Sequence, residues 1–188
     1  MKNLVSRNML SSSLFGLTSL FAGATSLNLN VTAIGAKDGS STLECWQIDN
    51  PFDNPTQPGL LGTAQLLLGA TSSLSYSIAP PNFDRGLHNA PQKQWVVFLT
   101  GVAHITLPDD NTTDAFIIGG PFGLIFAADT DDVSTKGHRT QHIGLTETIL
   151  FEMPTADGEV PQYHVLHMGP CDAGEIAGIR EYGLSAES

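Results

Sequence analysis

The sequence predicts an all-β domain, and three observations indicate it. Short runs rich in β-branched and aromatic residues recur along the chain, as in WVVFL at 95–99. Turn residues separate these runs, for example at 80–82 (PPN) and 108–111 (PDDN). No stretch shows the strand–helix alternation of a doubly wound sheet. Short strands at close spacing are typical of a β-sandwich or β-barrel.

The predicted strands begin at residue 43. LECWQI at 43–48 is the first, and a loop with three prolines follows at 50–62. In the run that begins at Gln94, period-two alternation places Gln94, Val96 and Phe98 on one face. A single helix is predicted near 173–182. The remaining predicted strands are 66–69, 74–78, 95–99, 102–107, 115–118, 124–127, 139–143, 147–151 and 163–167.

Length and charge limit what the domain can be. The chain has 188 residues, which suits one domain with its own core. Asp plus Glu is 19 and Lys plus Arg is 8, so the formal net charge is -11. Binding of phosphates needs clustered basic residues, so the balance argues against nucleic acid. It argues equally against docking on an anionic membrane.

The first residues are typical of a secretory signal peptide. Lys2 and Arg7 precede the uncharged, mostly apolar run at 9–22, and Ala22-Gly23-Ala24 is a small-x-small cleavage site. The run is too short to span a bilayer, so no membrane insertion is expected. The predicted organisation is a signal peptide at 1–24, an N-terminal arm at 25–42, a β-domain at 43–172 and a C-terminal tail at 173–188.

A secreted or secretory-pathway location determines how the cysteines are interpreted. Cys45 and Cys171 are expected to form one disulfide in an oxidising compartment, with two unpaired, buried thiols as the alternative. The triplets Asn30-Val31-Thr32 and Asn111-Thr112-Thr113 are glycosylation sequons. Both features agree with secretion.

Several segments in order resemble the cupin family. His88-Asn89-Ala90, three residues, Gln94, six residues and Gly101 follow the family's first motif of His-x-His, Glu and Gly. GPFGLIF at 120–126 is similar to the family's turn into a strand. The segment 129–138 is similar to the one that carries the second motif's histidine, here His138. The resemblance implies a single antiparallel barrel, a jelly roll, with its active site inside the mouth.

The departures from the family pattern bear on metal binding. Metal-binding cupins supply three His and one Glu, whereas the matching positions here are His88, Ala90, Gln94 and His138. One imidazole is missing and the anionic ligand is a neutral amide, so a divalent cation loses a donor and charge compensation. We expect no metal, while a weak divalent site at His88, Gln94 and His138 stays open. Asp129, Asp131 and Asp132 lack the EF-hand pattern and are expected to be solvated.

Small secreted cupin-like chains without the full metal set resemble the fungal hetero-Diels–Alderases of tropolone–sesquiterpenoid pathways. That resemblance implies a metal-independent enzyme joining a tropolone quinone methide to a terpene olefin. The expected catalytic residues are His88, Gln94 and His138, as hydrogen-bond donors to the heterodiene oxygen. The expected substrate-binding residues are Tyr76, Phe98, His104, His142 and Phe151.

Two other functions stay open. A metal-dependent cupin oxygenase or isomerase needs a further ligand, for which His104 and His142 are candidates. A non-catalytic cupin would bind a small molecule without turnover. In each case the expected partner is a small apolar organic molecule, and the resemblance also implies a homodimer.

Overall fold

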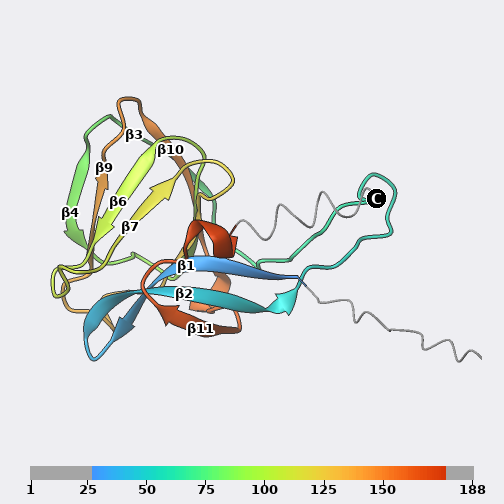
Figure 1. Ribbon diagram of the computed structural model, residues 1–188, viewed down its shortest axis with the longest axis horizontal. Helices are drawn as coiled ribbons and strands as arrows, with labels where there is room; N and C mark the ends of the chain where they lie inside the picture. The colour runs from blue at the N-terminus through green and yellow to red at the C-terminus, as the bar shows by residue number, and fades with distance from the viewer. Residues whose placement is uncertain (1–26, 177–188) are drawn as a thin grey trace, which may run out of the picture.

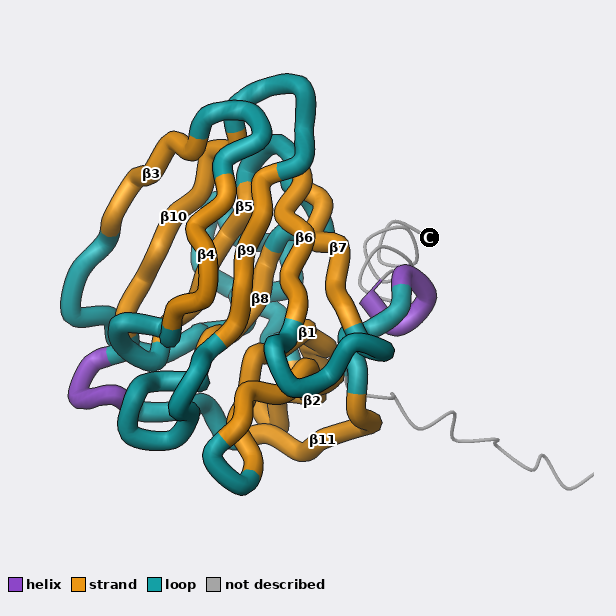
Figure 2. Tube along the Cα trace, turned by 90° about the vertical axis from the view of Figure 1, so that its left-hand side faces the viewer, coloured by secondary structure: helices purple, strands orange, loops and turns teal. Residues whose placement is uncertain are grey.

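The protein folds into two β-sheets that pack face to face. The structure, a computed structural model, describes residues 27–176 (Figure 1), so the signal peptide expected at 1–24 lies outside the described residues. Figure 2 shows the smaller sheet in front of the larger one. The all-β prediction is confirmed. Within 27–176, no helix is long and apolar enough to cross a membrane.

The larger sheet has seven strands and the smaller sheet has four. Neighbouring strands are antiparallel except β1 and β8, which are parallel. The larger sheet has the order β11 (Tyr163–Met168), β2 (Ser40–Pro51), β1 (Asn28–Lys37), β8 (Leu124–Ala127), β5 (Gln94–Phe98), β10 (Thr148–Pro154) and β3 (Ser75–Ala79). The smaller sheet has the order β4 (Asp84–His88), β9 (His138–His142), β6 (Val102–Thr106) and β7 (Asp114–Ile118).

The main core lies between the two sheets because alternate residues of their strands point inward. In β7, Ala115 and Ile117 are buried while Phe116 and Ile118 are exposed. The smaller sheet thus has one core face and one solvent face. Inward side chains of the larger sheet complete this core, among them Ile34, Leu43, Val96, Phe98, Ile125 and Leu150.

A second apolar cluster covers part of the opposite face of the larger sheet. It is built around Trp46, Trp95 and Phe126, and leucines of the segment 52–72 pack against it. The Trp95 indole donates a hydrogen bond to the carbonyl oxygen of Leu68 at 3.0 Å. Phe52, Leu66 and Leu68 therefore cover part of this face, which explains how the sheet carries apolar residues on both faces.

The described part of the segment expected as an arm belongs to the larger sheet, in β1 and the start of β2. Residues 28–37 form β1, which pairs with β2 on one side and with β8 on the other. Its composition is small and polar, and this misled the prediction. Small residues suit an inner strand whose two faces are both covered. At Gly35, a Cβ atom would lie 2.8 Å from a carboxylate oxygen of Glu44.

A disulfide fixes the C-terminal end of the described chain to β2. Cys45 and Cys171 are bonded, as predicted, although they lie 126 residues apart in sequence. A short helix begins at Ala173 and is described as far as Ile176. Its first turn is a capping box, because the Asp172 carboxylate accepts from the Glu175 N–H and the Glu175 carboxylate accepts from the Asp172 N–H.

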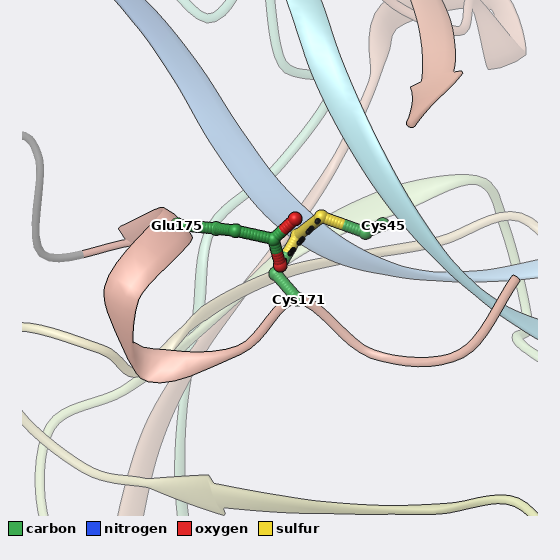
Figure 3. Close-up of side chains that lie close together, drawn as sticks. All are labelled: Cys45, Cys171 and Glu175. Atoms are coloured by element: carbon green, nitrogen blue, oxygen red, sulfur yellow. Dashed lines mark hydrogen bonds between the residues drawn. A yellow bond between two sulfur atoms is a disulfide. The ribbon is translucent and has the colours of Figure 1, made fainter. Parts of the chain in front are cut away.

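Figure 3 shows the Glu175 carboxylate beside this disulfide, with one oxygen 3.7 Å from the Cys45 sulfur. The three side chains bring their ligand atoms together. However, a disulfide sulfur carries neither a proton nor a thiolate charge, so this group is not a cation site in the oxidised protein. A buried disulfide of this kind is typical of proteins from oxidising compartments.

Candidate functional site

A cavity opens between the two sheets, where β4 and β9 face β5 and β10. It encloses about 500 Å³ of empty space, counting its open mouth. Its apolar wall comes mainly from the larger sheet and includes Val96, Phe98, Ala127 and Leu150. Its polar groups are Arg85, His88, Gln94, His138, Thr140, His142 and Glu152. Three imidazoles therefore meet an apolar surface in one enclosed space.

Strand alternation explains which side chains reach the cavity. In β5, Gln94, Val96 and Phe98 line it, as the sequence pattern predicts. In β9, the residues His138, Thr140 and His142 are buried and line it, while Arg139 is exposed on the opposite face. His138 and His142 occupy the same face because they are four residues apart in an extended strand.

His138 is held from behind by a buried carboxylate. Its Nδ1 lies 2.7 Å from Oδ2 of Asp129. The Asp129 side chain is 0% exposed and that of His138 is 6% exposed. The Ser41 hydroxyl donates to the same carboxylate oxygen at 2.7 Å. The imidazole orientation is therefore fixed, and Nε2 is the ring nitrogen that remains for the cavity.

His88 stands beside His138, with 4.5 Å between the ring centroids. Its Nδ1 lies 3.0 Å from the carbonyl oxygen of Gly86, which can only accept, so Nδ1 carries the proton. Burial lowers the pKa of His88, and the neighbouring His138 and Arg85 side chains lower it further. At neutral pH the His88 ring is uncharged and Nε2 is a hydrogen-bond acceptor.

His142 is the third cavity imidazole and has no polar partner. It is 1% exposed, and neither ring nitrogen has a hydrogen bond within the described chain. The ring lies between Phe83 and Phe98, at centroid distances of 6.1 Å and 6.4 Å. Burial lowers the pKa of His142, and Arg85 lowers it further. An unpaired buried imidazole costs folding free energy, so this ring indicates a place for a ligand.

An ion pair joins the two sheets at the cavity. Arg85 of β4 lies 3.4 Å from the carboxylate of Glu152 of β10. The Ser77 hydroxyl donates to the other Glu152 oxygen at 2.7 Å. Both charged side chains keep partial exposure, 31% for Arg85 and 21% for Glu152. This pair therefore marks the edge of the cavity that is open to solvent.

Three of the predicted substrate-binding residues lie outside the cavity. His104 faces solvent from β6, where its Nε2 lies 2.8 Å from Asp114 and its ring stacks on Phe116. Tyr76 is 57% exposed and makes an edge contact with Phe151, whose neighbours Leu150 and Glu152 line the cavity. These side chains lie outside the cavity because a strand residue and its immediate neighbour point to opposite faces.

The other predicted site residues converge on the cavity. His88, Gln94, Phe98, His138 and His142 all line it. Sequence reasoning missed several of their neighbours, namely Arg85, Thr140, Glu152 and the carboxylate behind His138. The expectation of a solvated acidic loop holds for Asp131 and Asp132, which are exposed, but not for Asp129. The sequence signal for Asp129 was its position nine residues before His138, in the segment that is similar to the one carrying the cupin family's second motif.

The two sequons lie in different environments. Asn111 is exposed in the turn between β6 and β7 and is open to modification. Asn30 lies on β1, where its side-chain amide donates to the carbonyl oxygen of Glu175 at 3.2 Å. Its side-chain oxygen accepts from Gln47 at 2.9 Å. The folded domain therefore uses the Asn30 amide that a glycan would occupy.

The donor set at the predicted weak metal position is neutral. His88 and His138 offer Nε2, and Gln94 offers its side-chain amide. Among the described His, Cys, Asp and Glu residues, the only group whose ligand atoms converge closely is the disulfide group with Glu175. Two imidazoles and an amide are a poor fit for a tightly held divalent ion, which prefers a third strong donor or a charge.

Comparison of the sequence with protein-family models and with curated proteins finds no significant match in either. The chemistry of the site therefore has to be judged from its own geometry. The cavity can enclose a small molecule against an apolar wall, accept hydrogen bonds at two imidazoles and donate them from an amide.

Proposed function

We propose that this chain is a secreted cupin-like enzyme of secondary metabolism that orients a small apolar organic substrate in the cavity between its sheets. One observation carries the proposal: an enclosed apolar wall faces several polar side chains, and one of them, His142, has no hydrogen-bond partner within the described chain. Such groups stabilise the protein poorly and serve a ligand well. The convergence of His88, Gln94 and His138 supports a cupin-type jelly roll.

Within this class we propose a metal-independent hetero-Diels–Alder reaction between a tropolone quinone methide and a terpene olefin. Such a pericyclic step needs orientation more than acid–base chemistry. Holding two partners in the reactive geometry lowers the barrier by up to roughly 7–11 kcal/mol in ideal cases. A hydrogen bond to the quinone-methide oxygen makes the heterodiene more electrophilic.

The structure changes the assignment of that hydrogen-bond donor. His88 commits its Nδ1 proton to Gly86, and His138 commits Nδ1 to Asp129. When neutral, both rings present a lone pair to the cavity. The donor is then the Gln94 amide or the N–H of His142. Both residues are buried, and the His142 ring nitrogens have no hydrogen-bond partner within the described chain. His88 and His138 position the substrate as acceptors.

A second candidate function has one specific observation in its favour. Histidines that bind metals commonly donate their second ring N–H to a carboxylate or a backbone carbonyl. His138 and His88 show these two arrangements. A metal-dependent cupin oxygenase or isomerase would hold its ion at their Nε2 atoms and Gln94, with substrate or water supplying the remaining ligands.

The test is an adduct assay with the mature protein from a secretory host, a tropolone quinone-methide precursor and a sesquiterpene olefin. We expect adduct of one stereochemistry, unchanged by a chelator. Gln94→Leu should lower the rate at least tenfold, because the lost donor acts on developing charge. The matched control, His104→Gln, changes a polar residue of the outer face and should keep the rate.

Each contrary outcome has a distinct meaning. Activity that a chelator abolishes and one divalent metal restores would move the chain to the second candidate. Saturable binding without any product would make it a non-catalytic binding protein. A Gln94→Glu variant sharpens the metal arm, because an added carboxylate should raise the affinity for Zn²⁺ or Ni²⁺ about tenfold or more only if His88 and His138 can share an ion.

A further inference from the structure

Asp129 is a fully buried carboxylate that does not reach the cavity itself, yet it touches a residue that does. Its Oδ2 atom accepts two hydrogen bonds, from Nδ1 of His138 and from the hydroxyl of Ser41, both at 2.7 Å. Burying a carboxylate is costly unless several donors surround it. This cost calls for a reason, and the Asp129 carboxylate accepts a hydrogen bond from a side chain that lines the cavity, His138.

The hydrogen bonds around Asp129 have one consistent direction. The backbone N–H of Gly137 donates to the Ser134 hydroxyl at 3.1 Å. The Ser134 and Ser41 hydroxyl oxygens are 2.8 Å apart. Since Ser41 gives its proton to Asp129, Ser134 must donate to Ser41. The chain of donors therefore runs from Gly137 to the carboxylate and ends on the oxygen that His138 also uses.

The loop that carries these groups is held at a second point. The side-chain amide of Asn89 donates to the carbonyl oxygens of Asp129 and Ser134, at 3.0 Å and 2.8 Å. Asn89 directly follows His88 at the end of β4. The same strand end therefore supplies one cavity imidazole and holds the loop that orients the other.

We infer that Asp129 is a positioning residue that fixes the His138 tautomer with its proton on Nδ1. His138 then presents an Nε2 acceptor to the cavity, beside the Nε2 acceptor of His88. A ligand must place an O–H or N–H group at this edge. This rests on the proposed function only in requiring that the cavity bind an organic ligand.

The first test reads the tautomer directly in the unaltered protein. Long-range proton–nitrogen NMR spectra of chelator-treated protein with ¹⁵N-labelled histidine distinguish a protonated ring nitrogen from one with a lone pair. We expect the Nδ1–H form for His138 and for His88. An Nε2–H form at His138, or a transition ion retained on its Nε2, would overturn the inference without any variant.

The second test uses phenol and its methyl ether, anisole, which differ in one hydrogen-bond donor. Wild-type protein should bind phenol about tenfold more tightly, because only phenol can donate to Nε2. Asp129→Ala releases the tautomer, with the His138 NMR signature changing in parallel, and should lower the affinity ratio below the wild-type value, although the Nε2 acceptor of His88 remains. Asp114→Ala, at the exposed histidine–aspartate pair, is the matched control and should keep both the ratio and the spectrum.

The two proposals fail in different ways. A folded Asp129→Ala variant that keeps the Nδ1–H form of His138 and the tenfold ratio would contradict the role of Asp129 and leave the proposed function standing. If neither probe binds the wild-type cavity, the proposed function loses its basis. In that case the tautomer spectrum of His138 still decides the role of Asp129.

Discussion

Two histidine–aspartate pairs lie on opposite faces of the four-stranded sheet, with nearly equal nitrogen–oxygen distances. His138 and Asp129 are 2.7 Å apart, with side chains 6% and 0% exposed. His104 and Asp114 are 2.8 Å apart, with side chains 22% and 49% exposed. Distance alone does not separate them. Their surroundings determine what each pair can do.

The inner pair belongs to a network of donors whose other end is a backbone N–H, and its imidazole faces a cavity. The outer pair lies at the edge of a sheet, where water competes for both partners and His104 gains its main contact by stacking on Phe116. A buried pair is expensive to break because each partner is left without water. An exposed pair of the same length contributes little.

The largest expected effect comes from removing the acid of each pair. Asp129→Ala leaves His138 Nδ1 and the Ser41 hydroxyl buried without their acceptor, so we expect the free energy of unfolding to fall by about 2–4 kcal/mol. Asp114→Ala should lower it by no more than about 0.5 kcal/mol. Urea unfolding at neutral pH measures both values, with equal slopes required for the comparison.

If both variants lose the same small amount, the buried network contributes no more than a surface pair. The contrast between the two faces then has no energetic meaning. A large loss at Asp114 would show instead that the outer face is covered in solution, for example by a second copy of the chain.

The sequence predicts some side-chain positions on the two faces well and others poorly. The apolar, β-branched and aromatic runs of β5 and β7 and the turn residues between strands specify the all-β fold. The three residues that the motif spacing singled out, His88, Gln94 and His138, line one cavity. The sequence did not determine which face of the sheet His104 and Phe151 occupy, because a shift of one residue moves a side chain to the opposite face.

Two further features could not be derived from local sequence. β1 is inner because β2 and β8 pair with it, which depends on contacts distant in sequence. Asp129 stands in an acidic loop with Asp131, and only the folded chain distinguishes the buried acid from the solvated one. In both cases tertiary contacts overrode the composition of the segment.

A smaller effect, of opposite sign, is expected at His142. Its two ring nitrogens are buried without partners between Phe83 and Phe98. Replacement by Leu removes these polar atoms and keeps most of the volume, so we expect His142→Leu to stabilise the protein by about 1 kcal/mol. The same variant should bind phenol more weakly. His104→Leu should give no gain in stability, because its ring nitrogen already has Asp114 as a partner.

Thermal or urea unfolding with the phenol titration tests this trade-off between stability and binding. A loss of more than about 1 kcal/mol on His142→Leu would mean that the wild-type ring nitrogens are hydrogen-bonded in solution. The assignment of His142 as a group that awaits a ligand would then be wrong.

The smallest expected effect is a difference in pH dependence between cavity and surface histidines. Burial lowers the pKa of His88 and of His142 below the ordinary value of 6.5. On acidification the unfolded chain therefore binds more protons than the folded chain. The contribution of these two histidines to stability is complete above pH 6.5 and is lost as the pH falls through their lowered pKa values. The opposite holds for exposed His167, whose pKa is raised by hydrogen bonds to Met168 and Glu175.

These signs can be separated by measuring unfolding in urea between pH 5 and 8. A variant with His88→Gln and His142→Leu should lose less stability than the wild type on acidification, because the two depressed groups are gone. His167→Gln should lose more, because a group that favours the folded state at low pH is gone. If the slope of the unfolding free energy against pH changes in the same direction in both variants, the cavity imidazoles are as well solvated as His167. The distinction between the buried and exposed histidines would then no longer hold.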